Sequence, residues 1–394
     1  MKMRRLTNAM NLRGKRVLVR IDGNVPVKNG RAVDGPHGRI ARSAVGINWL
    51  LQRGARVIVM THLGSPRGKR VAAYSIKPIA KRLSSLLGTR VKVTRSVVGG
   101  DVEKAVRAMQ DGEVLILENV RFDAREEQNA PSFAEALAKL GDLYVNDAFA
   151  VSHRAHASVD AITSELPSYA GPLLADELSV LSRLGERSKR PFVLVLGGLK
   201  MSTKLPLLLR LLPTLDRVLL GGAIASAFLV AQGQEVGKSA YEKESVALCA
   251  KLLKANKDKL LLPIDVVVAR SLRKDAHRRV VSVSEIGQSD RIVDIGSKTV
   301  SAFVQTLKGA RTILWNGPLG YCELQAFCAG TREIARAVGA QTGTATTIVG
   351  GGDTLPVIES LKLAETFTLL STGGGALLQF LSGEPLPGVE ALKN

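Results

Sequence analysis

The sequence predicts an α/β protein with two Rossmann-like lobes, each a parallel sheet flanked by helices, joined by an interdomain helix and hinge. Short apolar runs alternate with segments whose apolar residues recur at helical spacing, a pattern typical of successive βα units. The length of 394 residues exceeds what one hydrophobic core usually supports, so more than one domain is expected. The apolar runs of the two halves end in different kinds of residue.

In the first half, four apolar runs predict buried strands: RVLVRI from Arg16, RVIVM from Arg56, EVLIL from Glu113 and LYV from Leu143. Helical periodicity predicts helices over residues 39–52, 76–87, 102–109 and 133–140. Polar residues follow the strands, namely Asp22, Asn24, His62, Asn119, Arg121, Asn146, Asp147, His153, Arg154 and His156. Ligands of open parallel sheets bind outside the carboxyl ends of the strands, so these side chains predict a site for a small, strongly anionic molecule.

The alternation of strands and helices pauses between about residues 166 and 190. One amphipathic stretch, residues 173–184, is bounded by proline and glycine and predicts an interdomain helix with flexible ends. The expected organisation is an N-terminal domain over 1–170, this helix and hinge over 171–190, a C-terminal domain over 191–380 and a tail over 381–394. The tail contains Pro385, Pro387 and Gly388 and is expected to be a loop.

In the second half, six apolar runs read as strands, and five of them stop at a glycine-bearing turn. The five turns contain Gly197-Gly198, Gly221-Gly222, Gly317, Gly350-Gly351-Gly352 and Gly373-Gly374-Gly375, and the sixth run is LLLPIDVVVA at 260–269. Glycine allows backbone N–H groups to approach a phosphate closely, and the following helix offers its positive end. Five such turns at corresponding places predict a rim that binds a polyphosphate.

Two lysines and one aspartate add charge to this rim. Lys200 and Lys204 stand four residues apart at the start of an expected helix, where lysines need a nearby anion, although two solvated surface lysines are the plainer alternative. Asp353 is the acid within the glycine turns, which predicts a ligand for the Mg²⁺ that accompanies ATP; the alternative is a helix cap. The sequence lacks the GxxxxGK[ST] motif, so a P-loop ATPase is not expected.

Composition bounds the function further. The net charge of +20 favours anionic ligands, but aromatic residues make up only 4% of the chain, so dedicated nucleic-acid binding is not expected. No apolar run is long enough for a membrane helix, and the basic start MKMRR lacks the apolar region of a secretory signal. Three cysteines without a CxxC pair, Cys249, Cys322 and Cys328, predict a reducing, cytoplasmic compartment, buried thiols and no disulfide framework.

Several stretches together resemble the phosphoglycerate kinase family, in the family's order and over nearly the whole chain. They are Arg20–Pro26, Thr61–Gly64, Leu117–Phe122, Val145–Phe149 with His153–His156, Gly197–Lys200, Trp315–Gly320, Gly350–Thr354 and Ser371–Ala376. The resemblance implies a monomeric, Mg²⁺-dependent glycolytic kinase that moves a phosphoryl group in line between 1,3-bisphosphoglycerate and ADP, giving 3-phosphoglycerate and ATP. It also implies hinge closure between the lobes and a C-terminal tail that packs back on the first lobe.

The resemblance assigns roles residue by residue. The phosphoglycerate would be held by Asp22, Asn24, Arg39, His62, Arg121 and Arg154. The nucleotide would be held by Lys204, Glu323, Gly350, Gly351, Gly352, Asp353 and Thr354. Arg39 and Lys200 would be catalytic, Asp353 would bind the metal, and Gly373, Gly374 and Gly375 would present a helix N-terminus to the transferring phosphoryl group. The acceptor is a carboxylate that is already ionised at neutral pH, so the chemistry needs no general base.

One departure from the family pattern concerns the substrate side. Family members usually carry arginine where this chain has Ser65, and a serine makes no bidentate phosphate contact. We expect Arg67, Lys69 or Arg70 of the same loop to compensate. A second hypothesis is a drifted relative that binds nucleotide or other anions without efficient catalysis. The pair His153 and His156, three residues apart, lacks a third metal ligand at suitable spacing, so substrate-side or structural roles are expected for it.

Overall fold

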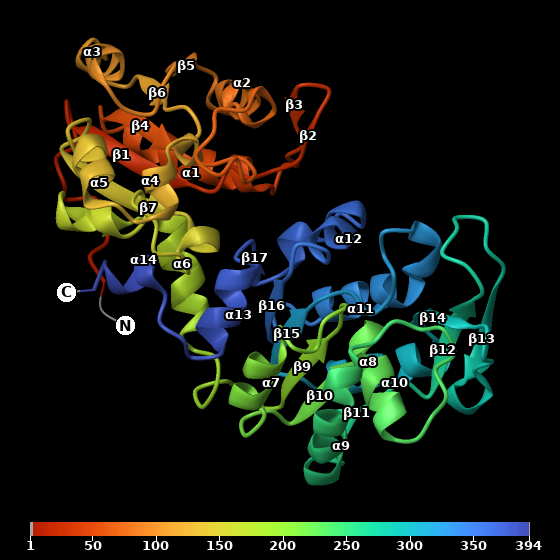
Figure 1. Cartoon of the computed structure of the whole chain (residues 1–394). Coiled ribbons are helices and arrows are strands. Elements are labelled where there is room, and N and C mark those ends of the chain that lie inside the picture. Colours follow the sequence, from red (N-terminus) through yellow and green to blue (C-terminus); the bar gives the residue numbers. More distant parts are fainter. Residues whose placement is uncertain (1–2, 394) are drawn as a thin grey trace. The chain divides into compact units, whose positions relative to one another are not determined.

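The structure, a computed structural model, describes residues 3–393 (Figure 1). Residues 1, 2 and 394, which belong to the expected first domain and tail, lie outside the described residues. The chain divides into two units, each with its own core. Unit 1 comprises residues 1–182 and 384–394, and unit 2 comprises residues 183–383.

Unit 1 is built on a six-stranded parallel sheet with the order β5-β6-β4-β1-β7-β8. Its strands are β1 Arg16–Ile21, β4 Arg56–Met60, β5 Val91–Val93, β6 Val114–Ile116, β7 Leu143–Asp147 and β8 Ser168–Ala170. Neighbouring residues of β1 enter different cores, with Val17 and Val19 on one face and Leu18 on the other. Both faces are buried, which explains why the strands read as continuous apolar runs.

Helices α1 Arg39–Leu51 and α2 Lys77–Leu87 pack on one face of this sheet, and α3 Gly100–Arg107 and α5 Pro131–Ala138 pack on the other (Figure 1). The further helices of the unit are α4 Ala124–Glu127, α6 Pro172–Leu181 and α14 Pro387–Glu390. Short 3-10 turns and a hairpin complete the unit: η1 Ala72–Tyr74, η2 Val120–Phe122, η3 Phe149–Val151, η4 Ala161–Ser164, β2 Val27–Lys28 and β3 Arg31–Ala32. The helices predicted over 39–52, 76–87, 102–109 and 133–140 correspond to α1, α2, α3 and α5, with ends within two residues.

The expected hinge is divided between the units at residues 182 and 183, and the expected tail belongs to unit 1 from residue 384 onward. Helix α6 begins beside Asp147, whose Oδ1 accepts a hydrogen bond from the Leu174 N–H at 3.1 Å, and it ends three residues before the predicted end. The tail is not a loop throughout, because Pro387 begins the short helix α14; proline is well suited to a first helical position. The tail contacts the segment before β1, with the Arg4 N–H donating to Leu392 O at 3.2 Å.

Unit 2 repeats the parallel plan with the strand order β11-β10-β9-β15-β16-β17. Its strands are β9 Phe192–Leu196, β10 Arg217–Leu220, β11 Leu260–Leu261, β15 Thr312–Asn316, β16 Thr346–Gly350 and β17 Leu369–Ser371. Its helices are α7 Leu205–Leu211, α8 Gly222–Ala231, α9 Val246–Ala255, α10 Ser297–Lys308, α11 Ala329–Gly339, α12 Leu355–Ser360 and α13 Gly375–Leu381. Its short 3-10 turns are η5 Lys243–Ser245, η6 Val283–Glu285, η7 Gln325–Phe327 and η8 Ala364–Thr366. The predicted α/β class with two parallel sheets is confirmed.

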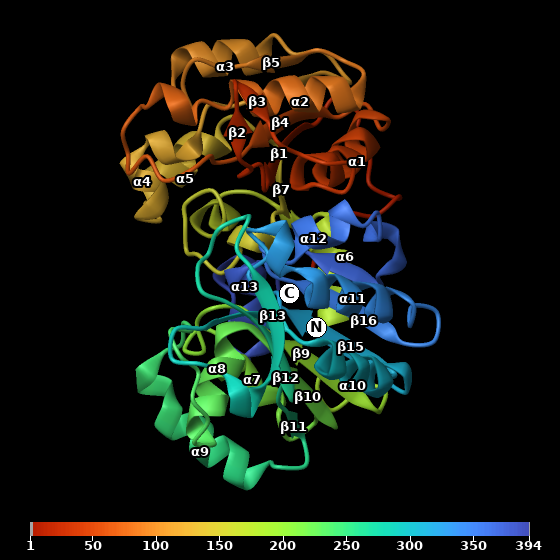
Figure 2. The same cartoon turned by 90° about the vertical axis from the view of Figure 1, so that its right-hand side faces the viewer.

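One predicted strand of unit 2 is wrong. The run over 260–269 splits at Pro263: the residues before it form β11 of the parallel sheet, and those after it form β12 Asp265–Ala269. Strand β12 pairs in antiparallel fashion with β13 Arg278–Ser282 and β14 Arg291–Ile295, and Figure 2 looks onto this second sheet with β13 nearest the viewer. Proline donates no ladder hydrogen bond, so it separates strands that the apolar pattern joins.

Buried aspartates cap the helices α6, α10 and α11. Asp147 accepts from the first turn of α6, Asp265 accepts from the Lys298 and Thr299 N–H groups of α10, and Asp294 accepts from the Gly330 N–H of α11. A Cβ added at Gly171, Gly296 or Gly320 would lie 2.3–2.4 Å from an atom of the respective aspartate, so these caps are packed against glycines. Each carboxylate satisfies N–H groups that the helix leaves unpaired.

Asp294 should make the stability of unit 2 depend on pH. Burial raises its pKa to about 7, against the hydrogen bonds from Gly330 and Ile295 that lower it. The folded protein therefore binds a proton that the unfolded chain releases near pH 4, and this contribution to stability is lost as the pH rises from about 4 to about 7. In urea titrations, the unfolding free energy of the wild type relative to Asp294→Asn is expected to fall over this range by roughly 4 kcal/mol at most. A pH-independent difference between the two proteins would contradict the prediction.

Candidate functional site

Asp22 orients Arg39 in unit 1. Strand β1 delivers Asp22 to its carboxyl end, and the Asp22 Oδ2 atom lies 2.8 Å from Nη1 of Arg39, the first residue of α1. The same Nη1 donates to Asn24 O at 3.1 Å, and the Asn24 Oδ1 atom accepts from the Gly64 N–H at 2.9 Å. Asp22 is buried, so the guanidinium is held by a fixed carboxylate and a fixed carbonyl. These contacts join the segments that follow β1 and β4.

Arg121 is a buried cation of this region. Its Nη1 donates to Gly64 O at 2.9 Å and lies 3.4 Å from Ser65 Oγ, and its Nε lies 3.3 Å from a carboxylate oxygen of Glu127. Burial, followed by the nearby positive charge of Arg154, lowers the pKa of Arg121 to about 10, so it stays charged at neutral pH. The structure therefore brings Asn24 and Arg121 onto one loop, Gly64-Ser65, and Arg39 is linked to that loop through Asn24.

His62 is a neutral hydrogen-bonding group here. Its Nδ1 atom lies 3.2 Å from Nη2 of Arg20, and an arginine only donates, so Nδ1 accepts and Nε2 carries the proton. Burial lowers the pKa of His62 well below its ordinary value, and the charges of Arg20 and Arg121 lower it further. His62 is thus a neutral N–H donor around pH 7.

Arg20 belongs to a buried network that the predicted site residues do not include. Its Nε donates to Ser158 Oγ at 2.9 Å, and Ser158 Oγ donates to Glu126 Oε1 at 2.6 Å. Both Arg20 and Glu126 are fully buried. A charged residue within the apolar run RVLVRI is the sequence signal for it. The network thus includes the arginine that contacts His62.

Arg154 is exposed, and its charge lowers the pKa of both Arg121 and His62. The two histidines beside it have different neighbours: the His153 Nε2 atom lies 3.3 Å from the Arg154 Nε, and the His156 Nδ1 atom lies 3.9 Å from Glu126 Oε1. Burial and then the charge of Arg121 lower the pKa of His156 to about 3. These placements agree with a structural role for His156.

Three polar residues predicted near the ligand are used for folding instead. Asn119 Nδ2 donates to Leu63 O at 2.8 Å and to Tyr74 O at 2.9 Å. Asn146 Nδ2 donates to Ser152 Oγ and to Gly388 O, both at 3.1 Å, and Asp147 caps α6. Their expected place among the ligand-facing side chains is wrong, because buried backbone groups of neighbouring segments already occupy their polar atoms.

The loop after Ser65 returns to Arg121. The Gly68 N–H donates to Arg121 O at 3.1 Å, and Arg67 adopts a left-handed backbone with a φ of 54° and an exposed side chain. Arg70 Nη1 donates to Arg95 O at 2.6 Å, which leaves Arg67 and Lys69 as better candidates for compensating Ser65.

Arg67→Ala is expected to raise KM for 3-phosphoglycerate, the substrate that the motif resemblance implies, about fivefold to thirtyfold. This corresponds to the loss of one charge-assisted contact of about 1–2 kcal/mol. Steady-state kinetics would check this, with Arg95→Ala as a matched control on an exposed arginine. An unchanged KM in Arg67→Ala would remove Arg67 as the compensating residue.

In unit 2 the glycine turns serve two purposes, of which only one was predicted. The Gly198 N–H donates to Pro318 O at 2.8 Å and the Gly222 N–H donates to Leu319 O at 2.9 Å, so these turns bind one another. A Cβ at Gly197 would lie 2.1 Å from Pro318 O. By contrast, a Cβ at Gly352 or Gly374 would meet no atom within 4 Å. The first set permits close backbone packing, and the second faces open space.

A cavity of about 310 Å³ in unit 2 collects the predicted phosphate-side residues. It is lined by Gly198, Leu199, Lys200, Thr203, Lys204, Asn316, Gly317, Pro318, Gly351, Gly352, Asp353, Gly374 and Leu378. Burial lowers the pKa of Lys204, and the charges of Asp353 and Glu242 oppose that effect. Gly350 and Gly373 are buried beside this lining, Gly375 begins α13, and Thr354 is a buried residue whose Oγ1 has no hydrogen-bond partner among residues 3–393.

The lysines lie before the helix rather than in its first turn. Lys200 and the residues up to Thr203 form a turn, and α7 begins at Leu205 with Lys204 as its N-cap. The expected helix therefore starts later than predicted, after both lysines. Glu242 accounts for the turn, since its carboxylate accepts from both the backbone N–H and the Oγ of Ser202 at 2.7 Å.

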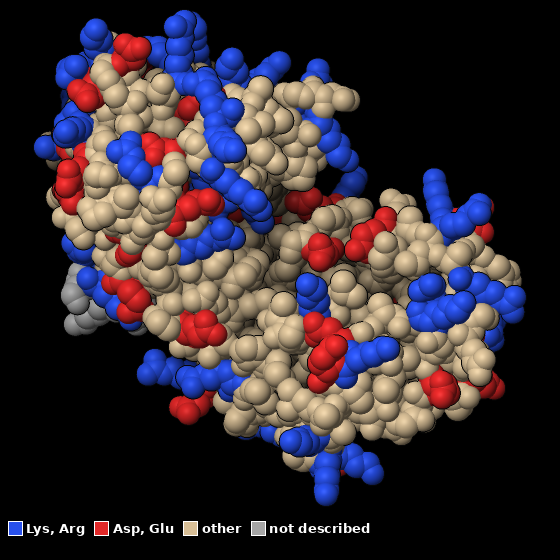
Figure 3. Space-filling view, in the orientation of Figure 1, with Lys and Arg blue, Asp and Glu red and all other residues tan. Residues whose placement is uncertain are grey.

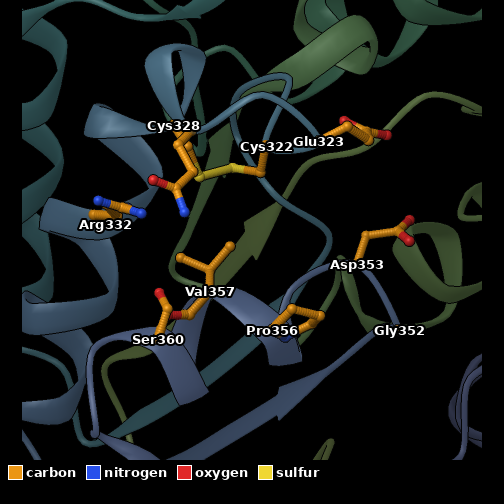
Figure 4. Close-up of a pocket in the computed structure, with 10 residues that line it drawn as sticks. Cys322, Glu323, Cys328, Arg332, Gly352, Asp353, Pro356, Val357 and Ser360 are labelled. Carbon is orange, nitrogen blue, oxygen red and sulfur yellow. A yellow bond between two sulfur atoms is a disulfide. The ribbon is translucent and has the colours of Figure 1, made fainter. Parts of the chain in front are cut away.

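A second cavity of about 190 Å³ adjoins the first and is more apolar. Its lining includes Gly222, Ala223, Leu272, Ile292, Leu319 and Glu323, and it shares Gly198, Leu199, Pro318 and Asp353 with the phosphate-side cavity. An apolar slot continuous with a lysine-lined cavity suits a molecule with a flat apolar part and an anionic part. Glu323 also lines a third cavity of about 340 Å³, where it and Asp353 approach from different loops (Figure 4).

The donors at Asp353 suit a magnesium ion that arrives with phosphates. Within residues 3–393 no three or more His, Cys, Asp or Glu side chains gather as a metal cluster. Mg²⁺ commonly takes one or two protein carboxylates and completes its shell with water and phosphate oxygens. A single exposed carboxylate beside two lysines fits that pattern and does not fit a protein-only cage.

The cysteines differ from the prediction. Cys322 and Cys328 form a disulfide, with 4.7 Å between their Cα atoms, whereas Cys249 is free and buried. The expectation of no disulfide rested on the odd count and the missing CxxC motif. The intervening turn η7 Gln325–Phe327 brings the two residues together, which spacing alone does not reveal.

The surface charge is dispersed. On the face drawn in Figure 3, Lys and Arg side chains are spread over both units and interspersed with Asp and Glu. None of the helices within residues 3–393 has the length and apolarity needed to cross a membrane.

Comparisons with known proteins decide the family. The phosphoglycerate kinase family model matches residues 7–384. The chain belongs to the phosphoglycerate kinase family. It is 46% identical over 386 residues to the phosphoglycerate kinase of Moorella thermoacetica and 45% identical over 384 residues to that of Herpetosiphon aurantiacus, with 97% of each chain covered in both cases.

Solved structures of the family agree over the whole chain. The phosphoglycerate kinase of Coxiella burnetii has a TM-score of 0.84 and 39% identity, covering 98% of this chain and 97% of its own. The enzyme of Pyrococcus horikoshii has a TM-score of 0.87 and 31% identity, covering 99% and 98%. The chain is thus a kinase of glycolysis that transfers a phosphoryl group between 1,3-bisphosphoglycerate and ADP.

Proposed function

We propose that unit 1 holds the phosphoglycerate and unit 2 holds the nucleotide, with the residue roles that the motifs suggest. Asp22, Asn24, Arg39, His62, Arg121 and Arg154 bind the three-carbon substrate. Lys204, Glu323 and Gly350 to Thr354 bind ADP or ATP. The observation that carries this proposal is the cavity of about 310 Å³ in unit 2, which is lined by Lys200, Lys204, Asp353 and the open glycine turns.

The proposed chemistry is in-line transfer with little covalent work for the protein. The acceptor in the ATP-consuming direction is an ionised carboxylate, so no side chain needs to remove a proton. Arg39, fixed by Asp22, neutralises charge on the phosphoglycerate side, and Lys200 neutralises the transferring phosphoryl group. The N-terminus of α13 at Gly373 to Gly375 adds backbone N–H groups.

Transfer requires the reacting oxygen and phosphorus atoms to meet, whereas the two sets of residues belong to different units. We therefore include closure of the hinge around residues 171–190 in the proposal, since closure also excludes water. Asp353 would hold the Mg²⁺ bound with the nucleotide, and the ion would neutralise negative charge on the phosphates. We also propose a cytoplasmic monomer whose partners are these two substrates.

A coupled assay of ATP consumption that depends on 3-phosphoglycerate tests the proposal. Turnover of about 1 s⁻¹ or more with Mg²⁺, and loss of activity when EDTA removes it, are expected. ATP binding without turnover would favour the drifted relative that binds anions without efficient catalysis. Repeating the assay at two salt concentrations separates specific binding from attraction by the +20 net charge.

Lys200→Ala is expected to lower kcat about a hundredfold or more while KM for ATP changes less than fivefold. Lys200 is exposed at the edge of the cavity, so its charge is available to the phosphoryl group in flight. Lys204→Ala is the matched comparison, because Lys204 is more buried than Lys200. This variant is expected to raise KM for the nucleotide and to change kcat less. The reverse pattern in steady-state kinetics would exchange the two roles.

A further inference from the structure

The Cys322–Cys328 disulfide lies beside the proposed nucleotide site rather than in the core. Both cysteines line the cavity of about 340 Å³ that also contains Glu323 and Asp353 (Figure 4). Cys328 is buried, whereas Cys322 is partly exposed. A small reductant in that cavity therefore has access to the disulfide, and Cys322 is the sulfur it reaches more readily.

The disulfide closes the segment that carries Glu323. At one end, the Tyr321 N–H donates to Val293 O at 2.8 Å; at the other, Phe327 is fully buried in a small core with Val293. Glu323 itself is exposed and stands directly after Cys322. Leu324 and Ala326 also pack against that small core, so the covalent link adds to contacts that already hold the segment. Its removal should loosen the backbone next to Glu323.

We propose that Cys322–Cys328 is a site of thiol–disulfide exchange that sets the affinity of unit 2 for the nucleotide. The oxidised protein holds Glu323 in place and binds ADP more tightly, and the reduced protein binds ADP more weakly. The inference rests on the proposed role of Glu323 in holding the nucleotide. In a reducing compartment disulfides are commonly transient and regulatory, which agrees with exchange here.

The exchange balances with a dithiol reductant. A thiolate of the dithiol attacks Sγ of Cys322, forming a mixed disulfide and breaking the Cys322–Cys328 bond. Cys328 leaves as a thiolate at the N-cap of the 11-residue helix α11, whose positive end stabilises it, and then takes up a proton. The second thiol of the reductant attacks the mixed disulfide, releasing Cys322 as a thiol and a cyclic disulfide. Two electrons and two protons pass from the dithiol to the protein.

The test compares ADP and 3-phosphoglycerate binding by calorimetry to the full-length protein before and after treatment with dithiothreitol. Thiols titrated in the unfolded chain without reductant should number one for the oxidised form, from Cys249, and three for the reduced form. Reduction is expected to raise Kd for ADP about fivefold to tenfold. Binding of 3-phosphoglycerate should not change, since the three cysteines all lie in unit 2.

Variants separate the sources of the effect. The double variant Cys322→Ser/Cys328→Ser should bind ADP with the Kd of the reduced protein, and dithiothreitol should not change that Kd. In Cys249→Ser, dithiothreitol should change the Kd for ADP as it does in the wild type. Equal ADP affinity in both redox states would overturn the inference while leaving the proposed function intact. Three thiols in protein prepared under air would also overturn it. If neither the oxidised nor the reduced protein bound ADP, the result would instead contradict the proposed function.

Discussion

Arg39→Ala is expected to lower kcat about a thousandfold while KM for 3-phosphoglycerate rises far less. An arginine directed at a transferring phosphoryl group contributes about 10³ to 10⁵ in rate, because charge spreads over the phosphoryl oxygens in the transition state. In unit 1 the Arg39 guanidinium is held by Asp22 Oδ2 at 2.8 Å and by Asn24 O at 3.1 Å, so it does not need to reorganise during transfer. Steady-state kinetics in both directions measures the effect.

Two further variants make this result interpretable. Arg53→Ala, just beyond the C-terminal end of α1 and stacked on Trp49, should leave kcat unchanged. Arg39→Lys keeps the charge but loses the planar fork, and it should recover only part of the rate. If Arg39→Ala raised KM and left kcat intact, Arg39 would be a binding residue and not a catalytic one.

Arg20→Met is expected to destabilise unit 1 by about 3–5 kcal/mol, the usual cost of leaving a buried charge without its partner. The Arg20 guanidinium contacts Ser158 Oγ at 2.9 Å and His62 Nδ1 at 3.2 Å, and its charge opposes the effect of burial on Glu126, whose pKa burial raises. Without Arg20, Glu126 must take up a proton or remain charged in an apolar environment. Urea unfolding, followed by a probe within unit 1, measures the loss.

Arg16→Met is the matched control on the same strand. Arg16 pairs with Asp142 at 2.6 Å, but both side chains are about a third exposed, so about 1 kcal/mol or less is expected. The double variant Arg20→Met/Glu126→Gln removes both charges and should recover part of the stability. If Arg16→Met and Arg20→Met lowered the free energy of unfolding equally, the buried network would contribute no more stability than an exposed ion pair.

The sequence predicts the part of the candidate site whose charged residues and glycine turns belong to recognisable motifs. Lys200, Lys204, Asp353 and the open turns at Gly352 and Gly374 were expected together, and they line one cavity. Each of them follows a strand of the parallel sheet, and the carboxyl ends of such strands meet at one edge. Their shared cavity follows from topology that the alternation of strands and helices already predicts.

Other residues looked alike in sequence and differ in the folded chain. Asn119, Asn146 and Asp147 follow strands just as Asn24 does, but their polar atoms bind backbone groups of neighbouring segments. Gly197 and Gly352 both follow strands, yet one is packed against Pro318 O and the other faces open space. A position directly after a strand places a residue at the edge of the sheet. It does not show whether that residue contacts a ligand or a neighbouring segment of the protein.

The sequence by itself determined the α/β class, two parallel sheets, the family and the residue types at each strand end. These are properties of local periodicity and ordered motifs. Only the tertiary structure decided the antiparallel sheet after Pro263, the Arg20–Ser158–Glu126 network and the Cys322–Cys328 disulfide. Each of these features requires segments to come within bonding distance of one another. Which segments do so is decided by how the chain packs and not by a local sequence pattern.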